Sequence, residues 1–399
     1  MANTVTDSSV SVSDPVQPSP TITKPKPTSS TPSTGTSSSI FSSKLSPALR
    51  SMLSAANIAI DSLSRTPITR LEKTALPNIG VIELVSAPDF MRHYDALYTA
   101  MFPRRAERER SDLIVDRLAA QASGERIGLA PYRIVGIRDS VTGEAIGAAQ
   151  FSVLPLSNDL GEQQHGQQQE DNQSNDVPEN GSPSSNFAVP YLQYLYIRPQ
   201  NRRQDMSEVL HTMVLAVSSA DALAMGDGRT VPFTLFETEP PDHGDDVASR
   251  AYARVRSSIH TSTGGLALML RREIAAEPQP EDNSGNTDEA NMPTKASSAQ
   301  LLSPHVQPGL EDGDPPLTLV WVIRQSPNPG RPYDVDRIGR RLIAAYYQSL
   351  RDEGFPEKNI KLAEMIVEEI CRGSVFHLMP LGEVPDLKDQ VYDAMGKGG

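Results

Sequence analysis

The chain has 399 residues, a formal net charge of −13 at pH 7 and one cysteine, Cys371. The acidic balance disfavours a general nucleic-acid binder and a protein that docks on anionic membranes. A single cysteine rules out an internal disulfide framework and a thiolate metal cluster. The sequence has no run of about eighteen apolar residues and no apolar signal-peptide core at its start. We therefore expect a soluble, cytoplasmic protein.

Composition divides the chain into one globular domain and long polar embellishments. Hydrophobic residues make up 38% of the chain and aromatic residues 5%, because Ser-, Thr-, Pro-, Gln- and Asn-rich stretches cannot form a core. The expected parts are a disordered tail (1–44), a linker that could hold a short helix (45–78), a domain (79–325) with low-complexity insertions at about 156–188 and 276–300, and a C-terminal helical extension (326–399).

Periodic apolar residues predict the elements of the first half of the domain. We expect a strand, two helices and two strands joined by a hairpin loop. In chain order their ranges are about 80–85, 90–102, 105–122, 132–138 and 144–154. After the first insertion, the strand Tyr191–Ile197 leads through a short turn into a long amphipathic helix that ends near Met225.

The second half continues this alternation of strands and helices. A helix from about Val247 to His260 should turn Tyr252, Val255 and Ile259 inward. The other expected elements are strands at about 231–239, 266–270 and 316–324, and two closing helices at about 334–353 and 356–371. This order predicts a mixed α/β domain, with a central mixed sheet flanked by helices.

The turn after Ile197 allows two interpretations. A strand that runs into a helix N-terminus presents backbone N–H groups and a positive helix end, and nearby arginines suit a pyrophosphate. Asp205 and Glu208, however, have the spacing of a capping box, in which carboxylates of the protein occupy the anion site and the arginines balance them. The sequence leaves both interpretations open. The arginines concerned are Arg198, Arg202 and Arg203.

The element order over residues 79–325 resembles the GCN5-related N-acetyltransferase superfamily, which has the acyl-CoA N-acyltransferase fold. In that family an Arg or Gln follows the fourth strand, then Gly-x-Gly or Gly-x-Ala opens a helix, then comes a Leu. Here Arg202 and Leu210 match, whereas Asp205 and Ser207 stand at the glycine positions. Two more strings look like one bacterial branch of the superfamily: Leu235-Phe-Glu-Thr-Glu-Pro240, and His305-Val-Gln-Pro-Gly-Leu310 followed by Pro316-Leu-Thr-Leu319.

The resemblance implies an acyl-CoA-dependent N-acyltransferase that moves an acetyl group from acetyl-CoA to an amine by direct attack. Acetyl-CoA would lie between the fourth and fifth strands. Backbone groups around Leu195 and Ile197 would hold the pantetheine arm, and Arg202, Arg203 and Ser207 would take the pyrophosphate. The two strands should separate at their ends, near Ile197 on one strand and Phe236 on the other.

The acceptor, a small-molecule or peptide amine, would be held near the end of the fifth strand. There Glu237 and Glu239 are candidate bases; the alternative is two ordinary charges at an exposed strand end. His260 stands where relatives carry a Tyr that protonates the departing thiolate, and a histidine suits that task. A histidine favoured electrostatically at a helix end is the alternative. Gln193 replaces the acidic residue that many relatives carry, and cannot act as a base.

Two other classes of function stay open. A catalytically silent domain of the same fold, serving as a binding or scaffolding module, also fits the missing glycines and Gln193. An unrelated α/β domain is the third reading. The histidines lack metal-ligand spacing, so we expect no metal site. The sequence does not reveal the acceptor, the acyl group or the oligomeric state.

Overall fold

A computed structural model of the chain describes residues 39–104, 108–157, 186–244, 246–273, 299–387 and 390–391. Residues 39–399 form one compact unit. Residues 1–44 were expected to be disordered; residues 1–38 of that tail, and most of the two low-complexity insertions, lie outside the described residues. For residues 39–44 the prediction is wrong, because Phe41 is completely buried and Lys44 Nζ donates to Ile79 O at 2.6 Å.

The unit alternates strands and helices along the chain. Its strands are β1 (Ile79–Leu84), β2 (Tyr132–Asp139), β3 (Ala145–Leu156), β4 (Phe187–Ile197), β5 (Phe233–Thr238), β6 (Gly265–Glu273), β7 (Ala299–Leu302), β8 (Val306–Gln307), β9 (Leu317–Thr318), β10 (Val320–Gln325) and β11 (Ser374–Met379). Its helices are α1 (Pro47–Ala55), α2 (Ile68–Thr74), α3 (Ala87–Asp89), α4 (Asp95–Met101), α5 (Ser111–Ser123), α6 (Met206–Met225), α7 (Val247–Ser262), α8 (Val335–Asp352) and α9 (Glu357–Cys371).

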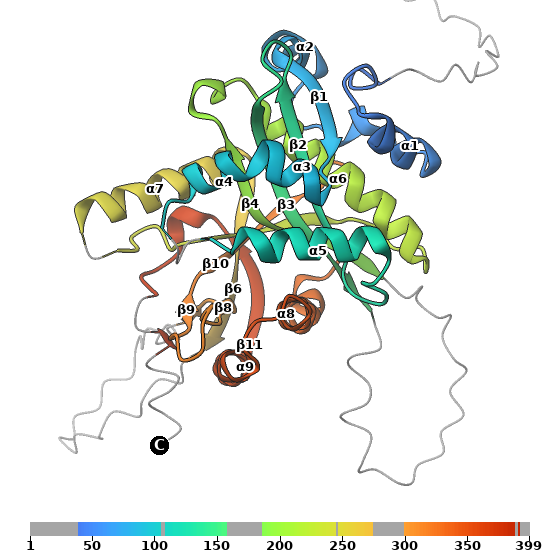
Figure 1. Ribbon diagram of the computed structural model, residues 1–399. Coiled ribbons are helices and arrows are strands. Elements are labelled where there is room, and N and C mark those ends of the chain that lie inside the picture. The colour runs from blue at the N-terminus through green and yellow to red at the C-terminus, as the bar shows by residue number, and fades with distance from the viewer. Residues whose placement is uncertain are drawn as a thin grey trace, which may run out of the picture. The chain divides into compact units, whose positions relative to one another are not determined.

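The main mixed sheet runs through the unit in the order β1-β2-β3-β4-β5-β10-β6-β11, with β7 paired to β6, and β8 and β9 form a separate two-stranded sheet. Neighbouring strands are antiparallel, except that β4 and β5 run parallel. Helices flank the sheet (Figure 1). The predicted mixed α/β class is therefore confirmed, as are the order and positions of most predicted elements.

Alternating strand residues point to opposite faces of the sheet, so each face has its own core. On β2, Val135 packs into the core that contains α1 and α6, whereas Ile134 packs with α4 and α5. Further along the sheet, α8 and α9 cover Leu268, on the same face as α5. Helix α6 is long and apolar enough by composition to cross a membrane, but 78% of its most apolar window is buried within the fold. Its apolar character therefore serves the core.

The chain beyond residue 325 belongs to the sheet domain and does not form a separate helical extension. Strand β11, which we did not predict, pairs antiparallel with β6 along six residues from Ser374 to Met379. Helices α8 and α9 supply buried side chains to the core beneath β5, β6 and β10. The apolar pattern of Ser374–Met379 is short and mixed, and an edge strand needs only one apolar face to pack.

The segment 45–78, expected as a linker, also packs into the domain. Leu45 forms a bridge with Ile82 on β1, and Phe41 is completely buried. The Ser46 side chain caps α1 by accepting from Leu49 N–H. Apolar side chains at helical spacing in this segment complete the core over α6, so the domain begins well before residue 79.

The inward face predicted for α7 is wrong. Tyr252, Val255 and Ile259 are each more than half exposed, and the helix instead buries the small residues Ala253 and Ser257. Small side chains allow a close approach of the helix to β5 and β6. The apolar stripe therefore lies on the outer side, which composition alone could not distinguish from the inner side.

Candidate functional site

The parallel strands β4 and β5 stop pairing well before their ends. They pair at Tyr191–Leu235, and Phe187 at the start of β4 bridges to Thr230 in the segment before β5; beyond these pairs no described residue joins the two strands in the ladder. The predicted separation near Ile197 and Phe236 therefore agrees with the register. Helix α6 begins nine residues after β4 ends, so a short loop connects the unpaired end of β4 to the N-terminus of α6.

Backbone groups of Leu195 and Ile197 point toward the unpaired edge. Arg198 N–H donates to Ile146 O at 2.7 Å across the β3–β4 ladder, which makes that pair a hydrogen-bonded one. Hydrogen-bonded and non-bonded pairs alternate in an antiparallel ladder. In the register, Ile197 faces Gly147 and Leu195 faces Ala149. Their own N–H and C=O groups therefore point away from β3, toward the β5 side.

The loop between β4 and α6 adopts the left-handed conformation that glycine would favour. Arg203 has φ 62° and Asp205 has φ 56°. Asp is one of the few residues besides glycine that visits this region readily. The Asp205 carboxylate turns aside to Arg70 (2.7 and 2.8 Å) and Thr74 (2.7 Å). Hydrogen bonds from Arg70 hold the pKa of Asp205 below its usual value.

The capping-box interpretation of Asp205 and Glu208 is wrong. Asp205 makes no side-chain cap bond to α6. Glu208 does not reach back to Asp205; it accepts from the backbone N–H of Arg65 (2.7 Å) and Thr66 (3.3 Å) and from the Arg324 guanidinium (2.6 Å). Spacing suggested a local bond, but long-range partners on other elements compete successfully for both carboxylates.

The three arginines of the loop separate into one structural and two available groups. Arg198 is bound to Asn201 (2.8 Å), Asp139 (3.0 Å) and Glu144 (3.0 Å). Arg202 and Arg203 are exposed, and among the described residues neither pairs with a carboxylate. Ser207, in the first turn of α6, is also exposed. Arg202 donates to Ile197 O (3.4 Å) and to Met101 Sδ (3.9 Å), but neither contact neutralises its charge. Two guanidinium charges thus lie in the loop that leads into a helix N-terminus, where an anion is favoured.

Glu237 is held in place on the opposite face of the sheet from α6. Its Oε2 accepts from Tyr191 O–H at 2.6 Å and lies 2.9 Å from His305 Nε2. His305 is completely buried and stacks on Trp321 with ring centroids 4.8 Å apart. Burial and the nearby Glu237 carboxylate raise the pKa of Tyr191, so its hydroxyl remains a donor. The carboxylate itself keeps 20% of its side-chain surface exposed.

Glu239 and His260 do not join Glu237. Glu239 forms an ion pair with Arg256 of α7, both contacts being 2.7 Å. The His260 ring packs edge-on against Phe236, at 5.4 Å between centroids, on the α6 face of β5. Burial, and next the Arg256 charge, lower the pKa of His260 to about 4. A neutral imidazole at pH 7 does not suit the general acid suggested by sequence, although it can still donate one N–H.

The lowered pKa of His260 predicts acid-sensitive folding. Between pH 6.5 and 4 the unfolded chain binds a proton that the folded protein does not, so stability falls as the pH drops. At about 1.4 kcal/mol per pH unit, the loss from His260 between pH 6.5 and 5 is about 2 kcal/mol. Buried His211, whose pKa is also lowered by burial and by Arg324, adds to the loss. Urea unfolding at pH 6.5 and at pH 5 should show a smaller loss of unfolding free energy for His260→Phe than for the wild type. An equal loss in both proteins would show that His260 is not the cause of the acid sensitivity.

A second buried polar network surrounds Gln193, the extra residue of a bulge in β4. Its neighbours Leu192 and Tyr194 face consecutive residues of β3, so Gln193 has no partner in the register. Gln193 Nε2 donates to both carboxylate oxygens of Glu353, at 2.9 Å each. Glu353 is the C-cap residue of α8 and its side chain is 2% exposed. No sequence signal joins two residues that lie so far apart in the chain.

Arg117 of α5 connects this network to the loop before α5. Its guanidinium pairs with Glu109 and lies 3.9 Å from Glu353. Burial raises the pKa of Glu109, and Arg117 opposes that rise. The backbone N–H of Glu109 also donates to the hydroxyl oxygen of Tyr194 at 3.0 Å. The loop is thereby tied to β4, next to the bulge.

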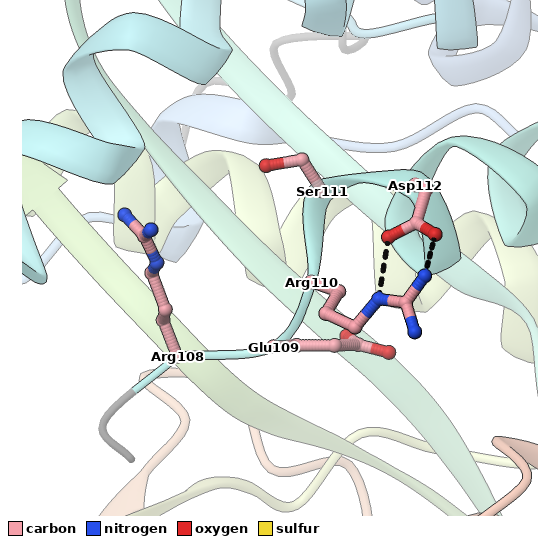
Figure 2. Close-up of a pocket in the computed structure, with 5 residues that line it drawn as sticks. All are labelled: Arg108, Glu109, Arg110, Ser111 and Asp112. Atoms are coloured by element: carbon pink, nitrogen blue, oxygen red, sulfur yellow. Dashed lines mark hydrogen bonds and ion pairs between the residues drawn. The ribbon is translucent and has the colours of Figure 1, made fainter. Parts of the chain in front are cut away.

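A small pocket of about 230 Å³ opens in the same loop, lined by residues 108–112. Figure 2 shows Arg110 paired with Asp112 while the Arg108 side chain extends away from that pair. Its lining is polar and comes entirely from five consecutive residues, 108–112, none of which belongs to β4 or β5. The pocket is therefore not the cleft expected between those two strands. Among the described residues no group of His, Cys, Asp and Glu side chains could hold a metal ion.

No family model and no curated protein matches the sequence. One solved structure that is similar is described as a GCN5-related glucosamine N-acetyltransferase region of a fungal multi-domain GH3 β-N-acetylglucosaminidase. The TM-score is 0.28 at 13% identity, over 50% of this chain and 19% of that chain. This chain thus spans about a fifth of that protein's length. A likeness at this level does not establish a family.

Proposed function

We propose that the protein is a GCN5-related N-acyltransferase that transfers an acetyl group from acetyl-CoA to a primary amine. The observation that carries the proposal is the parallel β4–β5 pair, which stops pairing at Tyr191–Leu235, well before β4 ends at Ile197 and the chain continues through a loop into α6. This is the position at which the resemblance places acetyl-CoA. The unpaired end of β4 leads into a loop with two exposed arginines, one of which donates to Ile197 O, and then into the N-terminus of α6.

The residues divide between the two faces of the sheet in a way that suits direct transfer. Acetyl-CoA would extend along Leu195 and Ile197, with its pyrophosphate near Arg202, Arg203 and Ser207. The amine would approach from the face of Glu237. Its nitrogen attacks the thioester carbonyl, the C–S bond breaks, and the amine proton passes to Glu237 directly or through water. Glu239, already paired with Arg256, would only help to orient this strand end.

The leaving group would depart on the other face. His260 and Phe236 lie on the α6 side of β5. Neutral His260 would donate a hydrogen bond to the thiolate and so stabilise it without transferring a full proton. We also propose a cytoplasmic location and an acceptor that is a small-molecule or peptide amine. The acidic net charge of the chain agrees with a protein that has no nucleic-acid or membrane partner.

Calorimetry with acetyl-CoA tests the placement of the phosphates. The wild type should bind, and the double variant Arg202→Ala/Arg203→Ala should weaken binding by about tenfold or more, since charge-assisted bonds to phosphate contribute roughly 1.5–3 kcal/mol each. Arg337→Ala is the matched control, because Arg337 is an exposed arginine (87%) on α8. Equal affinity of the double variant and the control would show that the phosphates lie elsewhere.

The silent binding module is the second candidate. It is favoured by Asp205 and Gln193, which depart from the residues of active relatives at the phosphate loop and in the middle of β4. A wild type that fails to bind acetyl-CoA at millimolar concentration would support the module and overturn the enzyme.

A further inference from the structure

The orientation of the Gln193 side chain is determined by chemistry. A carboxylate is only an acceptor, so the atom of the amide that meets both oxygens of Glu353 must be the N–H₂ group. Ser152 and Ser349 add hydroxyl contacts to Glu353 Oε1, at 3.0 and 3.2 Å, and hold the carboxylate in turn. The amide oxygen of Gln193 is consequently directed away from Glu353.

That oxygen has no hydrogen-bond partner among the described residues, although it is buried. A buried acceptor left unpaired costs roughly 1–3 kcal/mol. The oxygen can accept only from an N–H or O–H group. Its position at a bulge is typical of residues that a strand directs toward a ligand.

A second acceptor lies in the equivalent position on the neighbouring strand. Tyr191 and Leu235 are the last pair of β4 and β5, and Gln193 and Glu237 each lie two residues further on. Alternation places Glu237 on the face of Leu235. Gln193 is the extra residue of a bulge, so its face follows instead from its contact with Glu353 beside α8, on the face where Tyr191 and Leu235 also pack. Both hydrogen bonds to Glu237 fall on Oε2, and Oε1 accepts none from the described residues.

The charges around the two acceptors favour a cation. Tyr191 O–H donates to Glu237, and Gln193, two residues further along β4, donates to Glu353, so one short stretch of β4 contacts both carboxylates. Arg117 is shared between Glu109 and Glu353, and the Arg126 guanidinium also interacts electrostatically with Glu353. With Glu237 added, three carboxylates face two guanidinium groups, and the local balance is negative.

We propose that Gln193 Oε1 and Glu237 Oε1 together bind the N–H groups of a protonated primary amine. Glu353 is a positioning residue, which locks the amide so that its oxygen faces the ligand. This inference deepens the proposed transferase function, on which its catalytic meaning rests, but the binding itself does not require acetyl-CoA. The ammonium first gives one proton to Glu237, whose partly exposed carboxylate releases it to solvent water. Gln193 would retain a hydrogen bond to the neutral nitrogen and orient its lone pair, and the second proton, lost on attack, passes to the freed Glu237 carboxylate.

Butylammonium is the probe, and the side-chain amide resonance of Gln193 is the readout. The resonance is identified by its loss in Gln193→Met. It should shift on titration with butylammonium and remain in place with butanol, which lacks the charge. Gln193→Met, followed by calorimetry, should weaken butylammonium binding by about tenfold or more, because a bond to a charged donor is lost. Glu353→Gln should weaken it similarly, since a glutamine at 353 can also donate and allows the amide to turn.

Gln150→Met is the matched control. Gln150 is a buried glutamine of β3, but both ends of its amide are occupied, by Tyr132 O–H and Tyr196 O–H at 3.2 Å each. The Gln150→Met variant should bind butylammonium with the affinity of the wild type. An unmoved Gln193 resonance, or equal affinities of Gln193→Met and Gln150→Met, would overturn the proposal. Butylammonium binding without acetyl-CoA binding would retain this site and reject the transferase; the reverse result would retain the transferase and reject this site.

Discussion

Glu208→Ala should lower the free energy of unfolding by about 3–5 kcal/mol, the usual loss when one partner of a buried ion pair is removed. Glu208 and Arg324 are 9% and 8% exposed, and their contact is 2.6 Å. The same carboxylate accepts from the backbone N–H groups of Arg65 and Thr66. Its removal would leave one buried guanidinium and two N–H groups without their acceptor. Urea unfolding at pH 7 measures the loss.

The matched control for this variant is Glu364→Ala. Glu364 pairs with Arg351 at 2.5 Å, but the two side chains are 36% and 29% exposed, and a pair of that kind contributes about 1 kcal/mol or less. The double variant Glu208→Met/Arg324→Met should recover part of the loss, because no buried charge is then left unpaired. Equal losses for Glu208→Ala and Glu364→Ala would contradict the role assigned to the buried pair.

Arg117→Met should destabilise the protein by a similar amount, about 3–5 kcal/mol at pH 7. The guanidinium is 4% exposed and faces Glu109 and Glu353, whose side chains are 13% and 2% exposed. Without it, two carboxylates remain buried near each other. Both would then favour the protonated form.

The pH dependence distinguishes this mechanism from a simple loss of packing. A carboxyl whose folded pKa is raised binds its proton more tightly in the folded state, so stability falls as the pH rises past the unfolded value. The deficit of Arg117→Met relative to the wild type should therefore be larger at pH 7.5 than at pH 5. Arg110→Met removes an exposed pair with Asp112 and should cost little at either pH. A deficit that does not change with pH would indicate lost packing instead.

Sequence patterns identified the elements whose apolar residues repeat strongly. Helices α6, α8 and α9 and strands β2 to β5 lie close to their predicted ranges. The edge strand β11 was missed because its pattern is short. The orientation of α7 was predicted incorrectly because its buried side consists of Ala253 and Ser257, which give a weaker signal than the exposed stripe.

The candidate site was only partly accessible from sequence. Glu237 was recognised because it ends an apolar strand, and the arginines because they precede a helix. Tyr191 and His305, which hold Glu237, are brought together by sheet pairing between distant segments. Glu353 meets Gln193 through the packing of α8 on the sheet. Such long-range contacts leave no local spacing in one sequence, and the same reason explains why the capping box at Asp205 and Glu208 was wrong.

The most direct test of the transferase is CoA release from acetyl-CoA in the presence of primary amines: butylamine, spermidine, an amino sugar and a lysine peptide. The account predicts amine-dependent release by the wild type. Glu237→Gln should reduce the rate by about 100-fold or more, as expected for the loss of a general base. The control variant Glu364→Gln should release CoA at the wild-type rate. Wild-type protein that releases no CoA with any of these amines, or an undiminished rate in Glu237→Gln, would contradict the account.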